Sequence, residues 1–253
     1  MPLSGARPSS LSAIIITKNE AGDLPACLAS LAFCDEIIVV DSGSADGTVA
    51  IAEAAGCRVL VRTDWAGFGP QKQRALDAAR GDWVLSIDAD ERIPQALATE
   101  IRAAIETGAA AGYRINRLNS FLGKPLRHGG WYPDHHLRLV RRDAARFTPD
   151  LVHEKLIVDG AVSDLATDMP HLSYVDFDEV LDKQRRYALS GAAQRRASGR
   201  KGGAGKAAQR AIWLFFRLYV IKRGFLDGRE GFLAAAANAQ EMFWRYAAVD
   251  TAP

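Results

Sequence analysis

The N-terminal part of the chain alternates short apolar runs with stretches of helical spacing, and this alternation restricts the possible folds more than any other feature. Leu11 to Thr17 and Glu36 to Val40 are apolar, rich in β-branched residues and too short for helices. Asp23 to Leu31, between them, has leucines at helical spacing, and the alternation continues to Thr107. The pattern predicts an α/β fold with a doubly wound, mainly parallel sheet that helices cover on both faces.

Polar side chains follow the carboxyl ends of these predicted strands. In doubly wound sheets, ligands bind just beyond this edge, so we expect a binding site there. A carboxylate at such a place can accept hydrogen bonds from a ribose hydroxyl or a base N–H, although it can equally well cap a turn. The residues at these strand ends are Asn19, Glu20, Asp41, Asp88 and Asp90.

Asp88 and Asp90 are separated by one residue and come directly after the apolar run Trp83 to Ile87. Two carboxylates can converge where the chain turns, and hard oxygen ligands beside a phosphate suit Mg²⁺ or Mn²⁺. The alternative is that Asp90 or Glu91 caps the helix predicted to begin at Pro94. The position after a buried strand favours the metal site.

Other classes of protein are disfavoured. Gly67-Phe68-Gly69 does not follow a strand and precedes Pro70, so it is not a dinucleotide-binding fingerprint. The three cysteines have no paired spacing, which indicates reduced thiols in a cytosolic protein. Leu11 to Ile16 is too short for a signal peptide, and no apolar stretch is long enough to span a bilayer.

Charge is divided unevenly along the chain. Between Lys183 and Arg229 there are 13 Lys and Arg residues and one acid, whereas the remaining residues carry 19 basic and 29 acidic side chains. This division suggests a catalytic body joined to a segment that meets a nucleic acid or a membrane surface. The alternative is that the basic residues form a solvated face.

Ala211 to Ile221 lies inside the basic segment and contains ten apolar residues of eleven, with Lys and Arg on both sides. This composition is typical of a helix that lies in the headgroup layer of an anionic membrane. The alternative is a helix packed in a core or against a dimer partner. The sequence does not indicate an oligomeric state.

Six ordered motifs span most of the chain: Thr17-Lys18-Asn19-Glu20, Val39 to Thr48, Gly81 to Glu91, His135 to Arg142, Val152-His153-Glu154 and Gly224 to Phe232. These motifs resemble those of family 2 glycosyltransferases with the GT-A fold. The resemblance is closest to the bacterial branch that adds a sugar to the lipopolysaccharide inner core.

The resemblance implies an inverting transfer of a sugar, such as glucose from UDP-glucose, to a lipid-linked saccharide. It implies that Asp41 and the segment Thr17 to Glu20 hold the uracil and ribose. It also implies that Asp88 and Asp90 form the metal-binding pair for Mg²⁺ or Mn²⁺, with Asp88 toward the ribose. The acceptor hydroxyl needs a base, for which Glu154 is the candidate; the alternative is a surface residue paired with a neighbouring cation.

Further cations and a histidine are candidates for the same site. Lys72 can meet the nucleotide phosphate, or it can be an exposed helix charge. Arg127 and Arg138 can bind an acidic or phosphorylated acceptor. His153 can ligate the ion, orient Glu154 or simply pack.

We therefore expect a catalytic domain over residues 1–175 and a basic helical region over residues 176–253. The protein is expected to be cytoplasmic, in peripheral contact with the inner face of the membrane. A transferase for another lipid, polysaccharide or protein acceptor is the main alternative, and a nucleotidyltransferase is a more remote one. A nucleic-acid-binding protein is disfavoured, because strand-end carboxylates repel phosphates and no binding motif is present.

Overall fold

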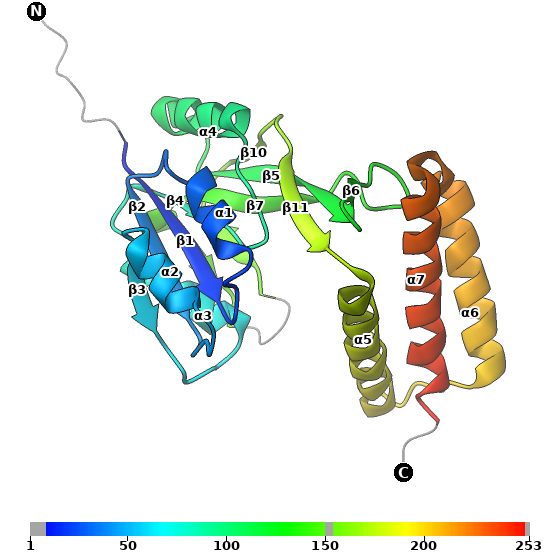
Figure 1. Cartoon of the computed structure of the whole chain (residues 1–253). Coiled ribbons are helices and arrows are strands. Elements are labelled where there is room, and N and C mark those ends of the chain that lie inside the picture. The colour runs from blue at the N-terminus through cyan, green and yellow to red at the C-terminus, as the bar shows by residue number, and fades with distance from the viewer. Residues whose placement is uncertain (1–8, 150–153, 251–253) are drawn as a thin grey trace, which may run out of the picture. The chain divides into compact units, whose positions relative to one another are not determined.

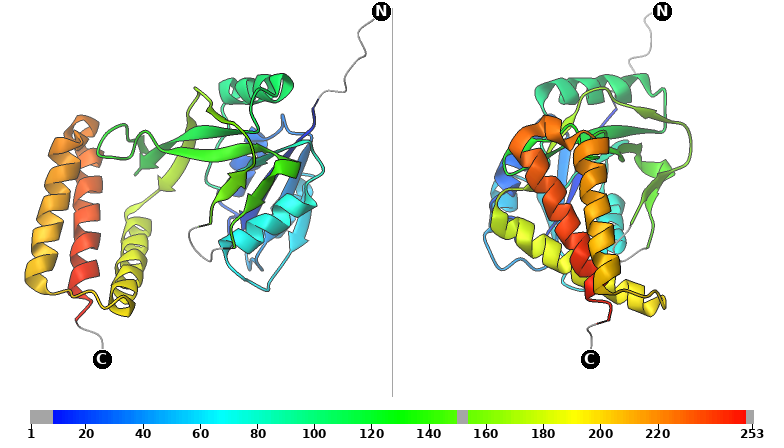
Figure 2. Two further views of the ribbon diagram at one scale, coloured as in Figure 1. Left: turned by 180° about the vertical axis from the view of Figure 1, so that it is seen from behind. Right: turned by 90° about the vertical axis from the view of Figure 1, so that its right-hand side faces the viewer.

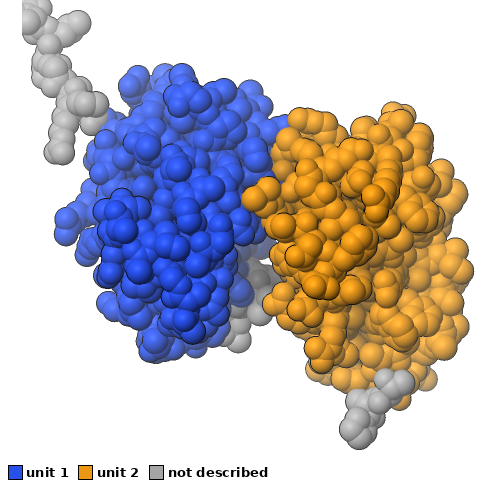
Figure 3. All heavy atoms as spheres, viewed as in Figure 1, with its two compact units in different colours: residues 1–117, 135–171 blue, residues 118–134, 172–253 orange. Residues whose placement is uncertain are grey.

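The structure is a computed structural model of the chain, which describes residues 9–149 and 154–250. The chain forms two compact units, which Figure 3 colours separately. Unit 1 contains Met1–Arg117 and His135–His171, and unit 2 contains Leu118–Asp134 and Leu172–Pro253.

Parallel strands form one half of the sheet in unit 1. Each pair is in the register that brings the carboxyl ends to one edge; for example, Thr17 lies opposite Asp41. Their order is β4 (Trp83–Ser86), β1 (Leu11–Thr17), β2 (Glu36–Asp41) and β3 (Arg58–Val61).

The other half of the sheet has mixed directions. β7 (His135–Arg141) is antiparallel to β4, and β5 (Gly112–Phe121) is antiparallel to β7. The short 3₁₀ turn η1 (Arg142–Ala144) follows β7. The remaining strands are β6 (Lys124–Pro125), β10 (Val162–Asp164) and β11 (Met169–Tyr174), which pair with β5, and β8 (Ala145–Phe147) and β9 (Leu156–Val158), which pair with each other.

Helices cover both faces of the sheet because consecutive strand residues point to opposite sides. In β1, Ala13 and Ile15 belong to one buried cluster and Ile14 belongs to another. Figure 1 shows α1 and α2 in front of the sheet, and the reverse view in Figure 2 shows α3 in front. The predicted doubly wound fold is confirmed. The helices of unit 1 are α1 (Leu24–Ser30), α2 (Thr48–Ala54), α3 (Phe68–Ala78) and α4 (Gln95–Thr107).

Unit 2 is mainly helical, as the C-terminal sequence predicts. Its longest elements are α5 (Phe177–Ala197), α6 (Ala204–Phe216) and α7 (Gly228–Ala247), and α7 contacts both of the others. A π-helical turn, η2 (Arg217–Ile221), and a 3₁₀ turn, η3 (Gly224–Asp227), connect α6 to α7. In the described part of the chain, no helix combines the length and the apolarity that crossing a bilayer requires.

The division into units differs from the expected boundary at residue 175. Residues 118–134, which were expected in the catalytic domain, group with the helices. The reason is packing: Phe121 and Leu126 share a buried cluster with Val180 and Ala234.

Candidate active site

The β1–β2 edge of the sheet holds a buried carboxylate, Asp41. Thr17 Oγ1 donates a hydrogen bond of 2.8 Å to Asp41 Oδ2, and the backbone N–H groups of Gly43 and Ser44 each donate one of 2.8 Å to Oδ1. Burial would raise the pKa of Asp41, but the hydrogen bonds it accepts, first those from Ser44, outweigh burial and lower the pKa. The ionised carboxylate of Asp41 therefore caps the turn after β2, as the alternative from the sequence allows.

Asn19 supports the same turn from the end of β1. It has a φ of 59°, a left-handed conformation that asparagine tolerates. Its side-chain oxygen accepts a hydrogen bond of 2.8 Å from the N–H of Ala45, and its own N–H donates to Ser44 Oγ. Gln71 of α3 is fully buried and donates to Ser42 Oγ at 3.0 Å. Gln71 is missing from the predicted set because a glutamine on a helix forms no recognisable pattern.

Asp41→Asn is expected to lower the free energy of unfolding by about 2 kcal/mol at pH 7, because an amide keeps only one acceptor oxygen. The folded-state pKa of Asp41 is depressed. Its stabilisation is therefore present above the unfolded-state pKa of about 3.9 and is lost as the pH falls through the folded-state value. The difference between the two proteins should shrink below about pH 4. Urea unfolding across pH measures it, and equal stability at pH 7 would contradict this role.

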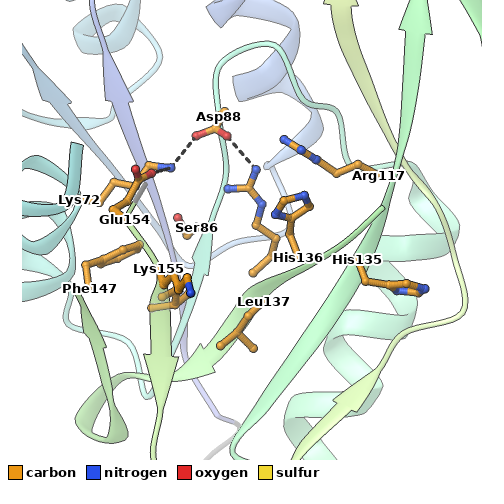
Figure 4. A pocket seen from close by; sticks show the side chains of 12 residues that line it. Lys72, Ser86, Asp88, Arg117, His135, His136, Leu137, Phe147, Glu154 and Lys155 are labelled. Carbon is orange, nitrogen blue, oxygen red and sulfur yellow. Dashed lines mark hydrogen bonds and ion pairs between the residues drawn. The ribbon is translucent and has the colours of Figure 1, made fainter. Parts of the chain in front are cut away.

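Asp88 follows β4 and lies between cations from two other elements. Lys72 Nζ of α3 is 3.2 Å from Asp88 Oδ1, and Arg138 Nη2 of β7 is 2.7 Å from Oδ2. Figure 4 shows Lys72 and Asp88 joined by a dashed line. Loss of hydration would raise the pKa of Asp88, but the charges of Arg138 and Lys72 outweigh it and hold the pKa well below its usual range. Asp88 is therefore an ionised acceptor at the strand end, and 31% of its side chain is exposed.

Arg138 is the buried centre of this group of ion pairs. It contacts both Asp88 and Glu91, and the Glu91 side chain is fully buried. Glu91 also accepts a hydrogen bond of 2.9 Å from the N–H of Asp88. Loss of hydration raises the pKa of Glu91, although Arg138 opposes the shift. The capping alternative is not observed, because α4 has Pro94 at its N-cap and neither Asp90 nor Glu91 caps it.

Glu154 shares a cation with Asp88. Glu154 Oε1 is 3.1 Å from Lys72 Nζ, and the Glu154 side chain is 14% exposed. These three residues line one pocket of about 570 Å³, and Arg117 and His136 are among its other lining residues (Figure 4). The pocket thus brings a strand-end carboxylate, a candidate base and several cations together. Lys72 is part of this pocket and not an exposed helix charge.

Asp90 lies beside His171, with 3.1 Å between Asp90 Oδ2 and His171 Nε2. Both side chains are partly exposed. Carboxylate oxygens and imidazole nitrogens are both common ligands of divalent metal ions. His171 belongs to β11, far from Asp90 in the sequence, and no motif indicates that the two residues meet.

The electrostatics of this edge favour a cation. Glu20 is half-buried, and loss of hydration followed by the charges of Asp90 and Asp23 raises its pKa to about 7. Among the described residues, no group of three or more His, Cys, Asp and Glu side chains could hold an ion. An ion at Asp90 and His171 would therefore take most of its ligands from water and phosphate, as Mg²⁺ usually does. The residues present fit such an ion.

The residues predicted to contact the acceptor or a phosphate do not all line this pocket freely. Arg138 lines the pocket but is buried against carboxylates, where it holds Asp88. Arg127 belongs to unit 2, where its guanidinium lies 5.1 Å from the ring centre of Tyr132. His153 lies outside the described residues.

Comparisons with known proteins agree with the motifs. A family model for glycosyl transferase family 2 matches residues 12–153. The lipopolysaccharide core biosynthesis glycosyltransferase LpsC of Rhizobium meliloti is 33% identical to this chain over 92% of this chain and 89% of its own length. An uncharacterized glycosyltransferase of Rickettsia felis is 31% identical over 94% of this chain and 88% of its own length.

Solved structures with similarity to the chain include one from S. aureus and one from Mycobacterium tuberculosis. S. aureus TarS is 19% identical, with a TM-score of 0.49, over 92% of this chain and 80% of that chain. Glucosyl-3-phosphoglycerate synthase from Mycobacterium tuberculosis, solved with Mn²⁺ and UDP, is 29% identical, with a TM-score of 0.37, over 44% of each chain. The family match spans more than half of the sequence, and the LpsC relative covers nearly all of it. The chain belongs to glycosyl transferase family 2.

Proposed function

We propose that this glycosyltransferase transfers glucose from UDP-glucose, with inversion, to a lipid-linked saccharide, the inner core of lipopolysaccharide. The observation that carries the proposal is the pocket in which Asp88, Lys72 and Glu154 meet. The similarity to a lipopolysaccharide core glycosyltransferase supports the acceptor. The choice of UDP-glucose follows from the family resemblance of the motifs.

The chain's own residues have distinct tasks in this reaction. A hydroxyl oxygen of the acceptor bonds to C1 of the sugar while the bond between C1 and the diphosphate breaks. Glu154 takes the hydroxyl proton as general base. Lys72, 3.1 Å away, fixes the position of the Glu154 carboxylate. Arg138 holds Asp88 at 2.7 Å so that its exposed part can accept a hydrogen bond from the ribose.

Asp90 and His171 would hold the divalent ion, with Asp88 as a second carboxylate nearby. When bound, Mg²⁺ or Mn²⁺ stabilises the negative charge that develops on the departing diphosphate. The segment Thr17 to Glu20 and Asp41 shape the loop that receives the base and ribose. This loop has a fixed form before the donor binds, because its turn is tied to Asp41 by hydrogen bonds.

A lipid-linked acceptor would place the protein at the inner face of the cytoplasmic membrane, in peripheral contact with anionic lipid. The 13 basic residues between Lys183 and Arg229 support this location. We propose no nucleic acid partner, because the negative sheet edge would repel a phosphate backbone.

A thermal-shift panel tests the donor and the ion. UDP-glucose with Mn²⁺ is expected to raise Tm by about 5 °C or more at about 100 times Kd, since a ligand that binds only the folded state stabilises it. In Asp90→Asn the part of the rise that depends on Mn²⁺ should be lost. Asp178→Asn, which changes an exposed aspartate of α5, should behave like the wild type.

Two results of this panel would contradict the proposal. An equal rise with Mn²⁺ and with a chelator would exclude a metal at Asp90. A larger rise with another nucleotide sugar would exclude UDP-glucose as the preferred donor. Release of UDP on addition of isolated lipopolysaccharide core, compared with other lipid-linked saccharides, then tests the acceptor.

A further inference from the structure

Exposed apolar side chains are concentrated in the last turns of α6, the connection to α7 and the start of α7. Among the described residues, 18 large apolar side chains are exposed, and eight of them fall within residues 212–232. We call these eight side chains the apolar tip; their exposed fractions run from 44% to 70%. They are Ile212, Trp213, Phe216, Val220, Ile221, Phe225, Leu226 and Phe232.

The segment that carries the apolar tip has a fixed shape. Phe215 stacks on Tyr219 with 5.4 Å between ring centres, and Phe232 meets the two rings edge-on at 5.6 and 5.5 Å. A side chain at Gly224 would come within 2.9 Å of the carbonyl oxygen of Leu218, so the backbone is packed closely here. The exposed side chains are therefore presented by an ordered surface and not by an unpacked segment.

Exposed basic side chains alternate along the chain with those of the apolar tip. Residues 204–229 contain six Lys and Arg, all of them exposed, and one acid, Asp227, which is buried. None of the six forms an ion pair with any carboxylate in the described part of the chain. The six are Lys206, Arg210, Arg217, Lys222, Arg223 and Arg229.

The charges decide which partner fits this surface. In a symmetric dimer the same patch of both copies meets, so the unpaired cations of one copy would face those of the other. An anionic bilayer offers the opposite charge at its headgroups and an apolar layer just below them. Aromatic side chains such as Trp213 are suited to the boundary between the two layers.

We propose that the apolar tip inserts into the headgroup layer of an anionic membrane, with the six basic residues on the lipid phosphates. The inference deepens the proposed function, because it names the surface behind the proposed membrane contact. It depends on the proposed function only in assuming that the protein meets a membrane. Binding of vesicles that contain neither donor nor acceptor therefore tests it separately from catalysis.

The experiment uses the full chain and sedimentation with vesicles of phosphatidylcholine, with or without phosphatidylglycerol. Trp213→Ser/Phe216→Ser is expected to weaken partitioning onto anionic vesicles by at least about tenfold. The matched control is Trp244→Ser/Leu181→Ser, because Trp244 and Leu181 are each 53% exposed, as is Trp213, and line a groove of the same unit away from the tip. The control should bind like the wild type.

A second pair of variants tests the charges. Arg217→Gln/Lys222→Gln should also weaken binding by about tenfold, and added salt should weaken the wild type more than this variant. Circular dichroism and the UDP-glucose thermal shift confirm that each variant folds. Equal losses in the tip and control variants, or equal binding to neutral and anionic vesicles, would overturn the proposal. So would a wild-type dimer that Trp213→Ser/Phe216→Ser converts to a monomer without any change in vesicle binding.

Discussion

Glu154→Gln is expected to lower kcat by about 10²- to 10⁴-fold while the affinity for the donor stays close to that of the wild type. Glutamine has nearly the same shape as glutamate but cannot accept the acceptor proton, and removal of a general base typically costs this much. Donor affinity should persist because Asp88 keeps its contact with Arg138 at 2.7 Å. Release of UDP at saturating acceptor measures kcat, and calorimetry with UDP measures donor binding.

The control for this variant is Glu53→Gln, the same substitution on the exposed side of α2. It should leave both kcat and donor affinity unchanged. If Glu154→Gln lowers donor affinity as much as kcat, Glu154 acts through Lys72, with which it is paired, and not on the acceptor proton. Wild-type turnover in Glu154→Gln would exclude it as the base.

Strands β1, β2 and β4 could be predicted because each is a mostly buried apolar run with a defined end. β1 has the predicted bounds, Leu11 to Thr17. The sequence defines helix starts less sharply: α2 begins at Thr48, although Asp46 lies only two residues before it. Asp46 Oδ1 accepts a hydrogen bond of 3.0 Å from the N–H of Thr48, so the aspartate precedes the helix and does not belong to it.

The partners of the strand-end carboxylates could not be predicted. Lys72 comes from α3, Arg138 from β7 and His171 from β11, and their meeting at Asp88 and Asp90 depends on packing between distant segments. Spacing along the chain carries no such information. The edge of the sheet was predictable because all parallel strands end there, whereas the pairings at that edge arise only in the folded chain.

The unit to which residues 118–134 belong could not be predicted from local sequence either. Their short extended pieces look like those of the preceding segment, so local pattern assigns them to the catalytic domain. Their grouping with unit 2 depends on long-range contacts, such as the hydrogen bond of 2.8 Å from the N–H of His128 to Asp227 Oδ2, 99 residues away. No local signal indicates such a contact.

Arg138→Met is expected to lower the free energy of unfolding by about 3–5 kcal/mol at pH 7, because it removes one partner of a buried ion pair. Glu91 is fully buried and would then keep only the longer ion pair with Arg117, at 3.8 Å, or take up a proton. Burial raises its pKa even with Arg138 present. A carboxyl whose folded-state pKa is raised loses stability as the pH rises above its unfolded-state pKa of about 4.3. The destabilisation should therefore shrink as the pH is lowered from 8 toward 5.

Two further variants test whether the destabilisation comes from breaking the buried ion pair or from losing an arginine in general. Arg141→Met makes the same change on the same strand, where the side chain is exposed and lies over the ring of Trp83, and should cost below about 1 kcal/mol. Arg138→Met/Glu91→Gln also removes the buried carboxylate and should recover part of the loss, because the two residues are in contact and their effects are not additive. Urea unfolding at several pH values measures all three. If Arg138→Met costs no more than Arg141→Met, Arg138 does not compensate Glu91, and its place in the pocket has to be explained by a substrate.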